Sequence, residues 1–133
     1  MNLTQLAKLL GGQGTPVEGC NLSAQEAVLT AQERFNPRPF CLVSEWKMLD
    51  LEISTDELNA LHARDLAPVI VYAPCVVLDS SGRFQPGDWV RTSFQSRYEA
   101  PGFFLTRNTV YILLGRGRRQ NITVDELNAF TAH

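Results

Sequence analysis

The sequence predicts a single α+β domain, in which a mainly antiparallel sheet of five or six strands carries three or four short helices. Three observations support this. The chain has 133 residues, which suits one domain spanning residues 1–133. Its first half contains apolar residues at helical spacing behind capping residues. Its second half contains β-branched and aromatic runs separated by turn residues.

The predicted helices begin at capping signals. Leu3, Leu6, Leu9 and Leu10 recur at helical spacing before Gly11-Gly12, which ends a first short helix. Residues 11–22 are rich in Gly and predict a loop. Ser23 lies three residues before Glu26 and opens a second helix through about Phe35. The segment 54–57 opens a third helix that ends near Pro68, and residues 125–130 predict a short last one.

The predicted strands follow residue 40. Residues 40–46 and 48–53 indicate either one long bent strand or two paired ones, with Met48, Asp50 and Glu52 on a wet face. The apolar run 69–78 contains Pro74, which favours an edge position or a bulge. Turns are expected at 79–82 and 86–88, and further strands at 89–94, 102–106 and 109–114, all in one sheet. The last two strands form a hairpin, and residues 115–119 (GRGRR) a polar loop.

The segment DELNA occurs twice, at residues 56–60 and 125–129. The residues around the two copies differ. Acidic residues are favoured in the first turn of any helix, because they meet the positive end of the helix dipole. We therefore favour convergence at two strand-to-helix junctions over an internal duplication.

Composition and cysteine count bound the class of protein. Twelve basic against fourteen acidic residues give a net charge of -2, which argues against a wholly basic nucleic-acid binder. No secretory signal and no apolar run of membrane-spanning length is visible, so we expect no membrane partner. Cys20, Cys41 and Cys75 are an odd number without metal-ligand spacing. Reduced thiols and a cytoplasmic location are the expectation, with no disulfide.

Catalytic and metal chemistry have little support. His62 and His133 are the only histidines, and they lack metal-ligand spacing, so we expect no metal and no cofactor. A nucleophilic pairing of Cys75 with His62 and Asp79 stays open. Buried apolar cysteines are common, however, so a structural role is favoured. We expect no catalytic residue.

Charge distribution is the more informative feature. The stretch 83–119 holds seven arginines against Asp88 and Glu99, a net charge of +5. Arginine suits phosphates and carboxylates, and interleaved aromatic residues occur on sheets that bind single strands. The candidate binding residues are Arg91, Arg107, Arg116, Arg118, Arg119 and Trp89. The simpler explanation is that ten Arg against two Lys reflect a GC-rich genome and that the aromatic residues form the core.

Three segments carry a family resemblance: residues 14–23 (GTPVEGCNLS), residues 86–93 (PGDWVRTS) and residues 106–119 (TRNTVYILLGRGRR). With them the chain resembles a family of small uncharacterised bacterial proteins found chiefly in pseudomonads and their prophages. The resemblance implies a cytoplasmic bacterial or phage accessory protein and carries over no site residue. Separately, the strand pattern around residues 86–114 is similar to that of small five-stranded barrels, an analogy of fold alone.

The expected function is non-enzymatic binding of a protein partner, as an inhibitor or immunity-type factor. The alternative is a nucleic-acid-binding module that uses the same surface. A small enzyme built on Cys75 or Cys41 ranks third.

Overall fold

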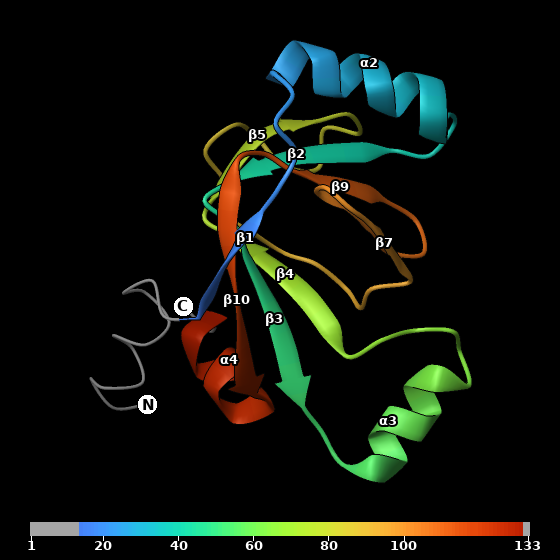
Figure 1. The fold of residues 1–133 in the computed structure, drawn as a ribbon, viewed down its shortest axis with the longest axis vertical. Helices are drawn as coiled ribbons and strands as arrows, with labels where there is room; N and C mark the ends of the chain where they lie inside the picture. The colour runs from blue at the N-terminus through green and yellow to red at the C-terminus, as the bar shows by residue number, and fades with distance from the viewer. Residues whose placement is uncertain (1–13, 132–133) are drawn as a thin grey trace.

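Two five-stranded sheets form the body of the molecule, in a computed structural model that describes residues 14–131 (Figure 1). The first sheet has the strand order β1 (Thr15–Glu18), β10 (Arg116–Thr123), β3 (Lys47–Glu52), β4 (Val69–Ala73) and β6 (Val90–Arg91). The second has the order β5 (Cys75–Asp79), β2 (Phe40–Ser44), β9 (Val110–Leu113), β8 (Phe103–Leu105) and β7 (Arg97–Glu99). The α+β class is confirmed. The single sheet was wrong, because the predicted strands divide between two.

Three long bent strands connect the sheets. β2 continues into β3, β4 into β5 and β9 into β10, and the same neighbours pair on both sides of the bend. The bends fall at Glu45 and Gly115, whose φ angles are 56° and 69°, and at Pro74. Strands that switch sheets at such corners are a known way to fold one sheet over onto itself. Of the two alternatives for residues 40–53, the bent strand is therefore confirmed, and Pro74 marks a corner.

Each sheet contains one parallel pair among antiparallel ones. β10 runs parallel to β3, and β2 runs parallel to β9, whereas the remaining pairs are antiparallel. The hairpin of β8 and β9 at Arg107-Asn108 is confirmed. So are the turns expected at 79–82 and 86–88, the second of which begins at Gln85.

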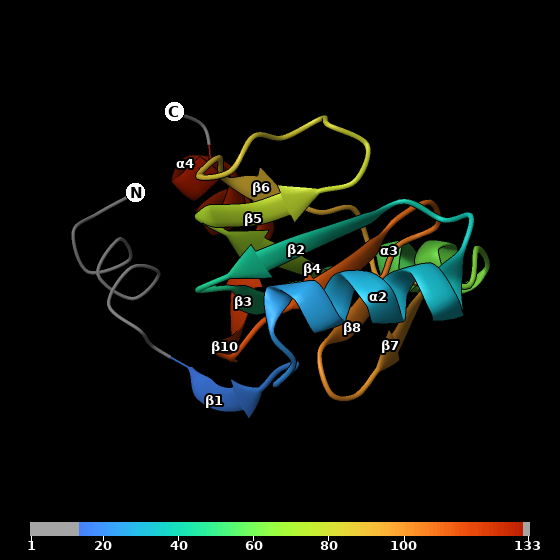
Figure 2. The ribbon, with the colours of Figure 1, turned by 90° about the horizontal axis from the view of Figure 1, so that it is seen from above.

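The core forms three layers of side chains. The largest cluster lies between the sheets and includes Trp46, Met48, Val71, Phe104 and Leu113. A second cluster packs the amphipathic helix α2 (Ala24–Phe35) across the second sheet (Figure 2). A third packs Leu127 of α4 (Val124–Thr131) on the outer face of the first sheet. No helix within residues 14–131 is both long and apolar enough to cross a membrane.

Capping boxes start the three helices within residues 14–131, and the sequence predicts the caps of the first two. Ser23 caps α2 and Ser54 caps α3 (Thr55–His62). At α4, Thr123 Oγ1 accepts from Glu126 N and Glu126 Oε1 accepts from Thr123 N, both at 3.0 Å. The helix predicted on Leu3–Leu10 lies outside the described residues.

The two DELNA segments follow the parallel pair of the first sheet. One comes after β3 and the other after β10, and both are strand-to-helix junctions. The structural match extends upstream, since β2 and β9 are also parallel neighbours. A strand–bend–strand–helix unit therefore occurs twice, side by side. This is the extension that a duplicated half would show, and it weighs against the convergence that we favoured.

Four other expectations were wrong in detail. The predicted loop at Gly115–Arg119 is the beginning of β10, and β1 and β7 lie in segments with no predicted strand. The predicted strand 89–94 shrinks to Val90–Arg91. Met48 is buried between the sheets and not on a wet face, because β3 is an inner strand that is covered on both sides.

Candidate functional site

The corner beside β10 is built around Trp46. Its indole Nε1 donates to the Leu114 carbonyl at 3.1 Å, and the ring is buried. Gly117 lies flat on this ring, since a Cβ there would stand 2.4 Å from the indole Cδ2. A glycine is therefore required in the middle of the arginine-rich strand. This packing fixes which way the neighbouring arginines point.

A row of side chains crosses the outer face of the first sheet. Arg118 of β10 pairs with Lys47 of β3, Lys47 pairs with Tyr72 of β4, and Tyr72 pairs with Arg91 of β6. Paired residues of neighbouring strands point to the same face. We call Arg118, Lys47, Tyr72 and Arg91 the cationic row. It contains three positive charges and no carboxylate.

Aromatic side chains lie at the β6 end of the cationic row. Tyr72 has 8% of its surface exposed and its ring centroid lies 6.1 Å from that of Trp89. Trp89 is 41% exposed, which is unusual for so large an apolar side chain. Burial raises the pKa of Tyr72, so its hydroxyl is neutral at physiological pH. Trp89 and Arg91 therefore offer a flat apolar surface beside a charge.

A hollow of about 350 Å³ lies at the other end of the cationic row. Lys47, Arg116 and Arg118 line it together with Glu45, Trp46 and Gly117. Burial, and then repulsion by Arg118, lowers the pKa of Lys47. An anion placed here would relieve this repulsion. The hollow thus brings three cationic side chains together with one carboxylate, Glu45.

The three arginines of β10 have different surroundings. Arg118 Nη1 donates to the Gly14 carbonyl at 3.3 Å, and Arg116 Nε donates to Glu18 on the edge strand β1 at 2.9 Å. Arg119 points to the opposite face, where it donates twice to Asp50 at 2.8 Å. Hydrogen bonding to Asp50 raises the pKa of Arg119. Arg119 is therefore a structural residue, whereas Arg118 belongs to the cationic row and Arg116 lies beside it.

The binding residues predicted from the sequence thus lie in different places in the fold. Arg91, Trp89, Arg116 and Arg118 come together on the outer face of the first sheet. Arg107 lies on the β8–β9 hairpin of the other sheet and donates to the Arg64 carbonyl at 3.2 Å. Lys47 and Tyr72 were missed. The signal that could have found them is cross-strand register, which one sequence does not supply.

The cysteines are not arranged for nucleophilic chemistry. Burial raises the pKa of Cys41 to about 12, and the Asp79 charge adds to this, so the thiol stays protonated. β5, with Cys75, and α3, with His62, lie at opposite ends of the molecule (Figure 1). Within residues 14–131, no three His, Cys, Asp or Glu side chains gather as a metal site would need.

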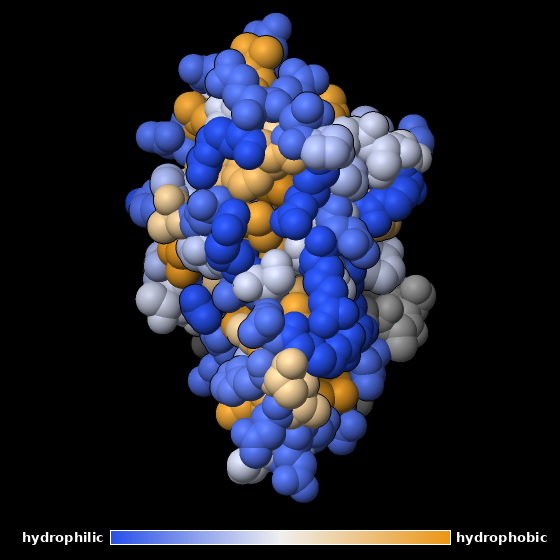
Figure 3. All heavy atoms as spheres, turned by 90° about the vertical axis from the view of Figure 1, so that its right-hand side faces the viewer, coloured by the Kyte–Doolittle hydropathy of each residue, from blue (hydrophilic) through white to orange (hydrophobic). Residues whose placement is uncertain are grey.

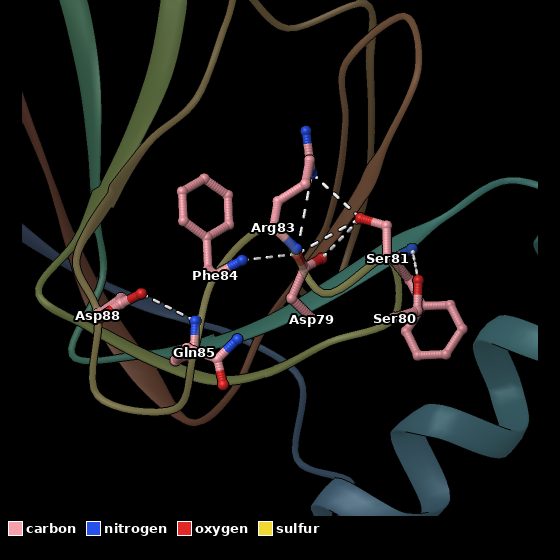
Figure 4. A network of polar contacts seen from close by, with 8 residues as sticks. Asp79, Ser80, Ser81, Arg83, Phe84, Gln85 and Asp88 are labelled. Carbon is pink, nitrogen blue, oxygen red and sulfur yellow. Dashed lines mark hydrogen bonds and ion pairs between the residues drawn. The ribbon is translucent and has the colours of Figure 1, made fainter.

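Asp79 has a structural role in the loop after β5 (Figure 4). Its carboxylate accepts from the backbone N–H groups of Arg83 at 2.7 Å and Phe84 at 3.1 Å. Arg83 Nε lies 3.8 Å from the same oxygen. In the next turn, Asp88 accepts from Gln85 N at 2.8 Å. Asp79 therefore stabilises this turn, and its hydrogen bonds are made to the turn backbone and not to a histidine.

Fold and site together define a small α+β domain in which two sheets share bent strands and one outer face carries the cationic row. A family model, described as a domain of unknown function (DUF6957), matches residues 18–129. The chain belongs to this family. Neither a curated protein nor a solved structure matches the chain.

Proposed function

We propose that this protein is a non-enzymatic binding protein that holds an acidic segment of a protein partner against the cationic row. The observation that carries the proposal is the register that aligns Arg118, Lys47 and Arg91 across three strands. Charge complementarity of this kind steers association and selects partners. The exposed Trp89 beside Arg91 would supply an aromatic anchor.

The resemblance described above supports the finer proposal. A cytoplasmic accessory protein of bacterial or prophage origin, acting as an inhibitor or immunity factor, would use such a surface to block a partner. A preformed sheet suits this role, because the backbone of paired strands needs no ordering on binding.

The alternative is binding of single-stranded nucleic acid by the same surface. The Tyr72–Trp89 aromatic pair next to Arg91 favours it, since bases stack on aromatic rings beside cationic grooves. Tyr72 is nearly covered, however, which leaves Trp89 as the main platform. Protein binding therefore ranks first.

The test is a double charge reversal, Arg91→Glu with Arg118→Glu. Tagged wild-type and variant proteins are used to capture partners from an extract of the native host, followed by mass spectrometry and titration of the purified partner. The matched control is Arg107→Glu, an exposed arginine on the other sheet. We expect the double variant to lose the partner and the control to keep it.

Three results would contradict binding of a protein partner by the cationic row. Equal capture by wild type and double variant would exclude the cationic row. Loss in the Arg107→Glu control as well would indicate a nonspecific charge effect. Tight binding of an oligothymidine strand, with an affinity that falls steeply with salt and a slope that flattens in the double variant, would favour the nucleic-acid alternative.

A further inference from the structure

A second basic site lies on a different face, at the end of α2. A groove of about 550 Å³ is lined by Arg34, Arg38 and Arg97, with Asp65 as its carboxylate. Phe35 is its main apolar surface, because the other large apolar residue of the lining, Leu105, is only 2% exposed. The side of the molecule that carries β7 and the end of α2 is shown in Figure 3, where apolar atoms lie in a hollow edged by hydrophilic ones. None of these residues belongs to the cationic row.

Arg34 is held in place by two aromatic rings. Its guanidinium carbon lies 5.0 Å from the ring centroids of both Phe35 and Phe103. These rings contact each other with centroids 5.8 Å apart. Cation–π contacts with two neighbouring rings restrict the side chain, which is what a pre-organised binding group requires.

Two guanidinium groups converge on one oxygen atom. Arg34 Nη2 donates to Glu99 Oε2 at 3.4 Å, and Arg97 Nη2 donates to the same oxygen at 3.5 Å. Both contacts are long, and the arginine side chains are 46% and 62% exposed. Exposed ion pairs of this length stabilise a protein little. The Glu99 carboxylate is thus held weakly between Arg34 and Arg97, and an anion that binds both arginines more strongly could replace it.

The groove retains positive charge after this pairing. Arg38 makes no side-chain hydrogen bond or ion pair within the residues that the structure describes. Two carboxylates accompany the three arginines: Asp65 lines the groove, and Glu99 pairs with Arg34 and Arg97. A carboxylate ligand would add one negative charge, whereas a phosphate group adds nearly two and offers three acceptor oxygens.

We propose that this groove binds a small phosphomonoester whose ester group is apolar. The phosphate oxygens would take the place of Glu99 Oε2 between Arg34 and Arg97, and Arg38 would contact a further oxygen. The apolar group would lie against Phe35. Glu99 then competes with the phosphate for Arg34 and Arg97, and it orients these two side chains when the groove is empty. This site is independent of the protein-binding function proposed above.

Phenyl phosphate is the probe for this proposal, titrated into the full-length protein by calorimetry or by NMR shifts. We expect saturable binding that is tighter than that of inorganic phosphate or of benzoate. Arg38→Ala and Arg97→Ala should each weaken it about tenfold, because each removes a charge-assisted hydrogen bond. Glu99→Gln should tighten it. Arg91→Ala, in the cationic row, is the matched control and should leave it unchanged.

The overturning results are equally definite. Absence of saturable phenyl phosphate binding would exclude the site. Equal affinity for inorganic phosphate would exclude the apolar part, and equal affinity for benzoate would exclude the preference for phosphate. Weaker binding by Glu99→Gln would show that this carboxylate supports the ligand and does not compete with it. Thermal melts of each variant would separate these effects from unfolding.

Discussion

Gly117 is the residue whose substitution tests the architecture most directly. An alanine Cβ at this position would meet Cδ2, Cε3 and Cε2 of Trp46 at 2.4, 2.5 and 2.6 Å. These distances are about 1 Å shorter than normal carbon–carbon contacts. The indole is 1% exposed and donates to Leu114, so it has nowhere to move. Overpacking of this kind costs about 1–3 kcal/mol, and we expect Gly117→Ala to lie near about 3 kcal/mol.

The assay is equilibrium unfolding in urea. With a slope of about 2 kcal/mol/M, the midpoint should fall by about 1.5 M. Gly82→Ala is the matched control: its φ is 70° and nothing lies within 4 Å of the added Cβ, so only the left-handed backbone contributes, about 1 kcal/mol. In the double variant Gly117→Ala with Trp46→Leu, the two losses should be less than additive, because the ring that clashes is gone. A Gly117→Ala protein within about 0.5 kcal/mol of wild type would refute this account of the corner.

Three further predictions concern stability. Arg119→Ala should lower the free energy of unfolding by about 1 kcal/mol in urea melts, because it breaks a bidentate, partly covered ion pair. The more exposed Arg116→Ala should change it by less than about 0.5 kcal/mol, and a larger effect of Arg116 would contradict the contrast. Ser54→Ala should lower it by about 1 kcal/mol through loss of the α3 cap, whereas Ser54→Asp should keep most of it. Burial raises the Cys41 pKa from 9.0 to about 12, so the thiol ionises first in the unfolded chain, and the free energy of unfolding should fall as pH rises from about 9 to about 12. A Cys41→Ala variant whose free energy of unfolding falls equally steeply in this range would show that other groups, such as the buried Tyr111, account for the effect.

The helices could be predicted because their signals are local. Ser23 with Glu26, and Ser54 with Glu57, satisfy helix N-terminal donors within four residues of sequence. No distant contact is needed to recognise them. The same reasoning located the hairpin turn at Arg107-Asn108, where two residues connect adjacent strands.

The strand β10 could not be predicted because nothing in its own sequence marks its environment. Gly117 replaces an apolar residue only because Trp46, seventy-one positions earlier, fills the space above it. Arg118 belongs to the cationic row only because of its register with Lys47. The alternating Gly and Arg of residues 115–119 therefore predicted a polar loop. The division of the strands into two sheets also depends on distant contacts, so the sequence did not predict it. The arginines were found from composition, but which of them share a face follows from pairing alone.

The position of β9 and β10 affects how the chain can be made. Both strands come from the last quarter of the sequence, yet each lies inside its sheet, with β9 between β2 and β8 and β10 between β1 and β3. In a nascent chain that ends before β9 and β10, β1 therefore has no strand to connect it to β3, and β8 has none to connect it to β2. Loops of about seventy residues must close before either parallel pair forms, so folding should be slow and mainly post-translational. Until then, the strands Phe40–Ser44 and Lys47–Glu52 lack their parallel partners and are exposed to chaperones and proteases.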